Sequence, residues 1–86
     1  MEIVYSSKFA RQYKKLPLVV KELVEKLEPT FRKNPFDPTL ETHKLKGRLE
    51  GFLSFSIGFK YRIIFELSTD KKIAYFHAVG GHDIYQ

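Results

Sequence analysis

The sequence contains no cysteine and no long run of apolar residues. Without cysteine the chain has neither a disulfide framework nor a thiolate metal site. Its three histidines lack the spacing of metal ligands, so we expect no metal and no cofactor. No apolar run approaches the roughly 20 residues that span a bilayer, and residues 1–5 begin as a strand rather than as a secretory signal. These absences predict a cytoplasmic protein without a membrane partner.

Positive charge is in excess along the chain. Fifteen Lys and Arg face ten Asp and Glu, which gives a formal charge of +5. From Lys44 to Arg62 there are five basic residues and a single acid. This suits a polyanionic partner, either a nucleic acid or an acidic protein, although a solvated surface is the alternative. With 86 residues, 43% of them hydrophobic, the chain should form one domain over residues 1–86.

The N-terminal half predicts a short strand followed by two helices. Residues 3–5 read as the strand, and apolar residues then recur at helical spacing on both sides of Pro17. The second helix carries the longer apolar stripe, which consists of Val20, Leu23, Val24, Leu27 and Phe31. Pro29 lies inside that stripe, so we expect it to kink or end the helix near Glu28.

The C-terminal half predicts three strands. Residues 52–57 and 60–67 alternate apolar and polar side chains, whereas residues 73–79 are apolar on both faces. The order β-α-α-β-β-β predicts an α+β fold, in which a small, antiparallel-rich, four-stranded sheet carries the helical hairpin on one face. We expect His77 to be a buried, hydrogen-bonded histidine. The core should include Phe9, Tyr13, Leu23, Leu27, Phe55, Ile63, Phe65 and Ile73.

The last residues place proton-transfer chemistry at the end of the final strand. The glycines at 80–81 allow a sharp turn, after which His82 supplies an imidazole and Tyr85 a ring that can stack on a base. The alternation in residues 60–67 turns Arg62 towards the uncovered face of the sheet. We therefore expect Arg62 and the tail to form one polar surface; the alternative is an ordinary frayed tail.

Four segments follow one another in a recognisable order. They are His43-Lys44-Leu45-Lys46-Gly47, Gly51-Phe52, Tyr61-Arg62-Ile63-Ile64-Phe65 and Val79-Gly80-Gly81-His82-Asp83-Ile84-Tyr85. Their order and spacing resemble the RelE/ParE toxin superfamily, and most closely the RelE and YafQ-like mRNA interferases of bacterial type II toxin–antitoxin modules. The likeness covers nearly the whole chain.

The resemblance implies an RNase-like fold that cuts messenger RNA in the ribosomal decoding site, without metal, while a cognate antitoxin holds it inactive. Cleavage in this family is an attack of a ribose 2′-hydroxyl on the adjacent phosphate, which needs a base, an acid and positive charge. Arg62 matches the strand arginine that lies near the scissile phosphate in RelE-type enzymes. His82 and Tyr85 match the C-terminal histidine and terminal aromatic of YafQ-like enzymes, and His43 matches the loop histidine of their His-x-Leu-x-Gly motif. The residues expected to bind RNA are Lys44, Lys46, Arg48 and Lys60.

The chain also departs from both patterns. RelE has two catalytic lysines where this chain has Leu53 and Phe55, and YafQ has a histidine and an aspartate where this chain has Ser56 and Lys60. The expected site is therefore a hybrid in which Lys60 supplies part of the missing charge. Two other functions stay open. One is a ParE-like toxin that inhibits DNA gyrase by binding, and the other is a catalytically weak member that acts mainly through its antitoxin.

Overall fold

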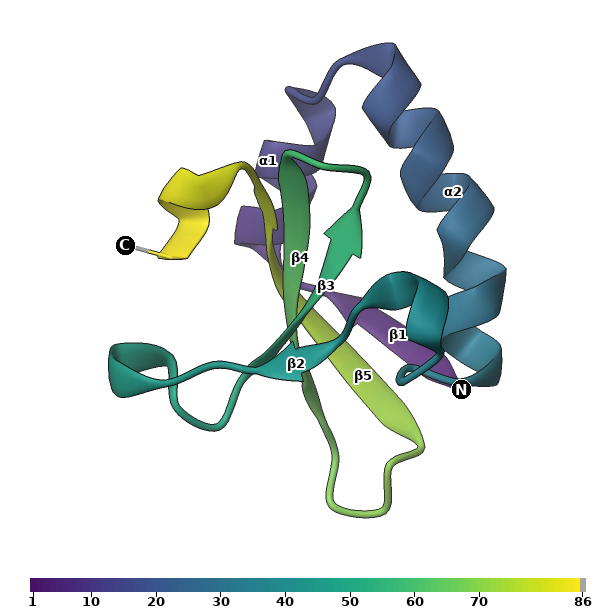
Figure 1. Ribbon diagram of the computed structural model, residues 1–86, viewed down its shortest axis with the longest axis vertical. Coiled ribbons are helices and arrows are strands. Elements are labelled where there is room, and N and C mark those ends of the chain that lie inside the picture. Colours follow the sequence, from purple (N-terminus) through teal and green to yellow (C-terminus); the bar gives the residue numbers. More distant parts are fainter. Residues whose placement is uncertain (86) are drawn as a thin grey trace.

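A helical hairpin lies against a β-sheet in the computed structural model, which describes residues 1–85 (Figure 1). The hairpin consists of α1 (Ser7–Lys14) and α2 (Leu18–Lys33). The Ser6 hydroxyl caps α1 by accepting a hydrogen bond of 2.9 Å from the Phe9 amide. The predicted hairpin is thus confirmed.

The helix does not end near Glu28, one of the two outcomes expected of Pro29, because α2 continues through this residue to Lys33. A proline inside a helix removes one backbone hydrogen bond and costs about 3 kcal/mol. Phe31 lies just beyond it and is fully buried, with its ring centroid 4.9 Å from those of both Phe55 and Phe65. Burial of this ring against two others offsets the cost of the proline, so the helix continues.

The sheet contains one strand more than the sequence predicts. Its strands are β1 (Glu2–Tyr5), β2 (His43–Lys44), β3 (Leu53–Ile57), β4 (Tyr61–Leu67) and β5 (Ile73–Gly80). Within residues 1–85 they form a five-stranded sheet in the order β1-β5-β4-β3-β2, in which only the β1–β5 pair is parallel. The extra strand, β2, has two residues and is too short to show an alternating pattern.

Short 3-10 turns complete the described chain. They are η1 (Pro38–Leu40), η2 (Gly47–Leu49) and η3 (His82–Tyr85). Figure 1 shows η3 and the loop that carries η2 on the side of the sheet away from α2. No helix in residues 1–85 is long and apolar enough to cross a membrane.

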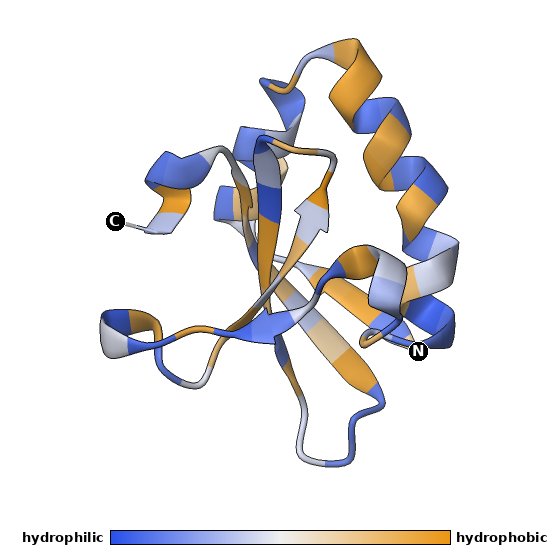
Figure 2. Cartoon of the chain, in the orientation of Figure 1, coloured by the Kyte–Doolittle hydropathy of each residue, from blue (hydrophilic) through white to orange (hydrophobic). Residues whose placement is uncertain are grey.

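The core lies between α2 and the sheet, where Phe31 contacts three phenylalanine rings of the strands. In Figure 2, apolar residues recur along α2 and along the central strands. The predicted core residues Phe9, Phe55, Ile63 and Phe65 are buried. Those that are partly buried are Tyr13, Leu23, Leu27 and Ile73.

The prediction that His77 is buried is wrong, because its side chain is 38% exposed. Its neighbour Phe76 takes the core-facing position, so His77 falls on the opposite, partly covered face. There its Nε2 lies 3.0 Å from the Glu66 carboxylate, and its ring lies edge-on to Phe52 at 5.0 Å. His77 is a surface residue held by a carboxylate.

Candidate active site

Arg62 lies in the middle of the sheet, on the face away from the helical hairpin. It pairs with Ser56 of β3 on one side and with Gly80 of β5 on the other. In β3, Ser54 shares the face of Ser56, and Ser54 pairs with His43 of β2. The register therefore brings Arg62, His43 and the start of the C-terminal turn to one region of one face.

The two serines of this face are closed off from solvent. Ser54 is fully buried and Ser56 is 7% exposed. The reason is the C-terminal turn, which folds back over the sheet and brings the Tyr85 hydroxyl to 3.1 Å from Oγ of Ser54. The tail is therefore docked on the sheet rather than frayed.

All four predicted catalytic residues line a single cleft of about 420 Å³. Its lining consists of His43, Leu45, Lys46, Arg48, Leu49, Arg62, His82 and Tyr85. The cleft thus combines two imidazoles, a phenol and three cationic side chains. Two of the four residues predicted to bind RNA, Lys46 and Arg48, belong to it.

The other two predicted RNA-binding residues lie elsewhere. Lys60 lines a neighbouring cleft of about 500 Å³, which also has Arg62 and His82 in its wall. Phe59 lines the same cleft and is 99% exposed. Lys44 is exposed on β2 and is absent from the lining of both clefts.

His43 has a defined arrangement of ring hydrogens. Its Nδ1 lies 3.2 Å from the backbone carbonyl of Glu41. A carbonyl only accepts hydrogen bonds, so Nδ1 carries the hydrogen in this contact. In the neutral ring, Nε2 is then left with its lone pair, which can accept a proton.

Arg62 is held by one end of its guanidinium. Its Nη1 donates to the carbonyl oxygens of Tyr61 at 2.9 Å and Phe59 at 3.3 Å. Within residues 1–85, neither its Nη2 nor its Nε makes a hydrogen bond, and no carboxylate forms an ion pair with it. These two nitrogens form an edge suited to two oxygens of a phosphate.

His82 and Tyr85 come from the same turn of η3. Their rings meet edge to face, with centroids 5.5 Å apart. The turn is closed by a backbone hydrogen bond of 3.2 Å from the Ile84 amide to the Gly81 carbonyl. The imidazole and the phenol therefore enter the cleft as one unit.

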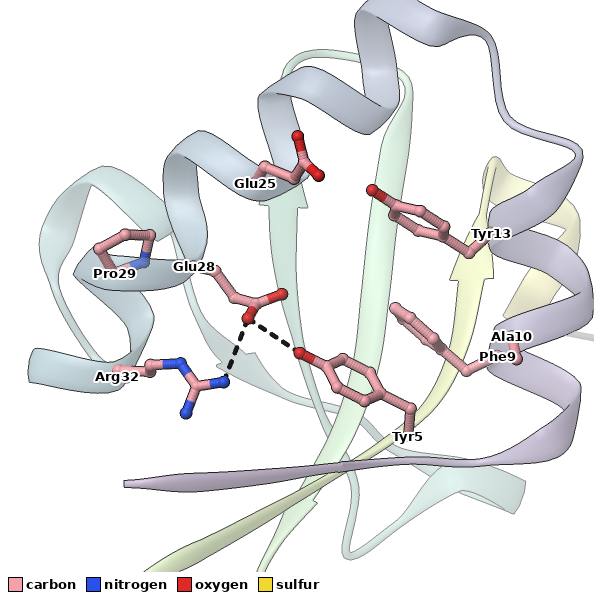
Figure 3. A pocket seen from close by; sticks show the side chains of 8 residues that line it. All are labelled: Tyr5, Phe9, Ala10, Tyr13, Glu25, Glu28, Pro29 and Arg32. Carbon is pink, nitrogen blue, oxygen red and sulfur yellow. Dashed lines mark hydrogen bonds and ion pairs between the residues drawn. The ribbon is translucent and has the colours of Figure 1, made fainter.

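A third cavity, of about 540 Å³, lies between β1, α1 and α2 (Figure 3). The Tyr5 hydroxyl donates to the Glu28 carboxylate at 2.8 Å, and Arg32 pairs with the same oxygen at 3.3 Å. Burial, followed by the bond to Glu28, raises the pKa of Tyr5 to about 12. Burial, together with the charges of Glu25 and Glu28, also raises the pKa of Tyr13. The lining contains no histidine, so this cavity lacks the imidazoles of the first cleft.

No cluster of three or more His, Asp or Glu side chains that could hold a metal ion is found in residues 1–85. The charge available to the cleft comes from Lys46, Arg48 and Arg62.

Solved structures with the same fold include bacterial toxins. A YoeB/ParE toxin from Agrobacterium tumefaciens superimposes with a TM-score of 0.80 at 19% identity, covering 95% of this chain and 99% of that one. YafQ from Escherichia coli gives 0.79 at 19% identity, covering 98% of this chain and 96% of that one. A RelBE toxin–antitoxin complex from Mycobacterium tuberculosis gives 0.78 at 16% identity, covering 94% of this chain and 96% of that one. No family profile and no curated protein matches the sequence.

These similarities establish that the chain has the fold of the RelE, YafQ and YoeB toxins. The resemblance found in the sequence is thereby confirmed at the level of the fold.

Sequence reasoning gave Ser54 no role of its own in the candidate site. The signal that could have found it is the pairing of Ser54 with His43, which is visible only once β2 is known to join the sheet.

Proposed function

We propose that this protein is the toxin of a type II toxin–antitoxin pair and an endoribonuclease that cuts ribosome-bound mRNA. The observation that carries the proposal is the cleft itself: His43, Arg62, His82 and Tyr85 come from three separate parts of the chain and line one cavity. The fold shared with RelE, YafQ and YoeB supports the same reading.

In the proposed reaction, the ribose O2′ attacks the adjacent phosphorus. The O2′–P bond forms and the P–O5′ bond breaks, which leaves a 2′,3′-cyclic phosphate and a free 5′-hydroxyl. One proton leaves O2′ and one proton is delivered to O5′. We assign the first transfer to Nε2 of His43, whose Nδ1 is engaged with a carbonyl, and the second to His82.

We assign electrostatic stabilisation of the transition state to Arg62. Negative charge grows on the non-bridging oxygens as the phosphorane forms. The Nη2 and Nε edge of Arg62 can donate to both oxygens at once, while Nη1 keeps the guanidinium fixed on the turn carbonyls. A guanidinium fixed in this way needs little reorganisation when the transition state forms.

RNA recognition is assigned to side chains around the two clefts. Lys46 and Arg48 approach the backbone phosphates from the first cleft, and Lys60 approaches from the second. Tyr85 can stack on a base, and the exposed ring of Phe59 offers a second stacking surface. Lys44 extends the same basic surface along β2.

The partner that controls this activity is proposed to be a cognate antitoxin. A protein with a formal charge of +5 suits an acidic partner. Among the proteins with this fold, those from Mycobacterium tuberculosis and Staphylococcus aureus were solved as RelBE and YoeB–YefM complexes. Expression of the chain alone should arrest growth, and co-expression of a small acidic protein encoded beside it should restore growth.

The decisive experiment incubates the purified protein with ribosomes programmed with a defined mRNA. We expect cuts that leave 2′,3′-cyclic phosphate ends and that disappear when a 2′-deoxynucleotide replaces the residue whose O2′ attacks. His82→Ala should slow cleavage by about 10²–10⁴-fold. Wild-type cleavage rates in both His82→Ala and Arg62→Ala would show that the site is assigned wrongly.

The two other functions form further arms of this experiment. Inhibition of DNA gyrase on supercoiled DNA, with mRNA left intact, would indicate a ParE-like toxin. Tight binding of the acidic partner with neither activity would indicate a catalytically weak member.

A further inference from the structure

We propose that Ser54 and Gly80 are positioning residues that hold the C-terminal turn on the sheet, so that His82 and Tyr85 face the cleft. Neither residue lines the cleft itself. The inference rests on the proposed function for its catalytic consequence, but the docking of the turn can be measured without RNA.

The turn has little to hold it in place by itself. η3 contains four residues, none of them buried. A backbone hydrogen bond from the Ile84 amide to the Gly81 carbonyl closes its start. Isolated turns of this length are unstable in water. Contacts with the sheet must therefore keep the turn in place.

Ser54 supplies the polar contact. Its side chain is fully buried in β3, and its Oγ lies 3.1 Å from the Tyr85 hydroxyl, so one of the two donates to the other. A buried hydroxyl without a partner is unfavourable, and Tyr85 provides that partner. The bond also places the phenol next to His43, because His43 is the β2 neighbour of Ser54.

Gly80 supplies the close approach. A Cβ atom built on Gly80 would lie 2.6 Å from Cγ2 of Ile84, which is shorter than such contacts allow. Gly80 does not have a positive φ, so left-handed backbone is not the reason for glycine here. The residue leaves a space on β5 that the Ile84 side chain fills. The freedom to turn sharply, which the sequence suggested, is not what this position uses.

The Gly80 contact can be tested by introducing a steric clash with Ile84 and then removing it. Gly80→Ala should push Ile84 off the sheet and lower the docked-to-undocked ratio by about 5- to 100-fold, the range for one excess methyl in a packed site. Gly80→Ala combined with Ile84→Ala removes the colliding Cγ2 and should behave like Ile84→Ala alone. An alanine fits a strand well, so β5 should stay folded in both variants.

The Ser54 contact can be tested as a double-mutant cycle. Ser54→Ala and Tyr85→Phe each remove the same hydrogen bond, and each should lower the docked ratio by about three- to tenfold. Because they share that bond, the double variant should be little worse than either single variant. Ser56→Ala is the matched control, since Ser56 is a buried serine of the same strand and face but has no hydrogen bond to the turn within residues 1–85.

Two measurements without RNA report on docking. The first is hydrogen exchange of the Ile84 amide, which is protected only while the turn is closed. The second is the ring-proton NMR signal of His82, which feels the ring of Tyr85 at 5.5 Å and is one of three histidine signals. The exchange rate and the His82 signal should both change in Gly80→Ala and in Ser54→Ala. In the variant that combines Gly80→Ala with Ile84→Ala, both should equal the values of Ile84→Ala alone.

Cleavage of ribosome-bound mRNA then separates the two claims. If the variants lose docking but the wild type does not cleave mRNA, the proposed function is wrong and the positioning roles still stand. Slower cleavage by Ser54→Ala with unchanged exchange and His82 signals would overturn the positioning role, because Ser54 would then act on the substrate directly. Failure of Ile84→Ala to relieve Gly80→Ala would overturn the role of Gly80.

Discussion

Replacement of Arg62 by lysine tests the geometry of the site more strictly than removal of the side chain. The guanidinium uses Nη1 on the carbonyls of Tyr61 and Phe59 and keeps Nη2 and Nε for the phosphate. A lysine ammonium has three donors at one point. If it meets the same carbonyls, one donor is left for the phosphate.

The expected loss follows from this count of donors. One charge-assisted hydrogen bond contributes about 1.5–3 kcal/mol, and about 1.4 kcal/mol corresponds to tenfold in rate. Arg62→Lys should therefore cleave about 10- to 150-fold more slowly than the wild type. Arg62→Ala loses the charge and both bonds, so it should be slower still.

The assay is single-turnover cleavage of ribosome-bound mRNA at saturating protein, so that binding and chemistry separate. Thermal unfolding of Arg62→Lys should resemble that of the wild type, because the ammonium can donate to the same two carbonyls. Equal cleavage rates for Arg62→Lys and the wild type would refute the two-point contact with the phosphate. A fully inactive but well-folded Arg62→Lys would show that more than one hydrogen bond to the substrate requires the guanidinium.

Three further predictions concern stability. Phe31→Ala should lower the free energy of unfolding by about 3–5 kcal/mol in urea titrations, because its fully buried ring packs on three others. A loss below about 1 kcal/mol would contradict the packing of Phe31 in the core. The raised pKa of Tyr5, about 12, means that stabilisation by its protonated phenol is complete below about pH 10 and is lost as the pH rises towards 12. The unfolding midpoint of the wild type should therefore fall more steeply over that window than that of Tyr5→Phe, and parallel curves would refute the bond to Glu28. His77→Ala should change stability by no more than about 1 kcal/mol, since its pair with Glu66 is exposed; a larger loss would restore the buried-histidine reading.

Much of the fold follows from local patterns in the sequence. The alternation in β4 gave the face of Arg62, and the stripe in α2 gave the buried Phe31. The errors arise where a distant contact overrides a local rule. Pro29 stays helical because Phe31 is held by the sheet, and His77 is exposed because an apolar run on both faces does not reveal how far each face is covered.

The site was predictable in its chemistry and less so in its construction. Residue types and order pointed to His43, Arg62, His82 and Tyr85, which the fold does bring to one cleft. Their support was not visible, because it depends on β2 joining the sheet and on a bond between Ser54 and Tyr85, 31 positions apart. Local propensity carries no information on a contact of that range.

The strand faces also change how this site compares with that of RelE. Leu53 and Phe55, which take the place of its lysines in sequence order, are both buried on the core side of β3. A lysine at either position would point into the core, so the residues that share the face of Arg62 are Ser54 and Ser56. Neither serine carries charge.

In the proposed reaction, the positive charge for the phosphorane must then come from outside β3. Lys46 and Arg48 supply it from the loop with η2, and Lys60 supplies it from the turn before β4. Charges on long side chains in loops attract a phosphate from a distance but are less fixed than charges on a strand. In the proposed reaction, the rim attracts the RNA, and stabilisation of the transition state is assigned to Arg62, whose guanidinium is fixed on two turn carbonyls.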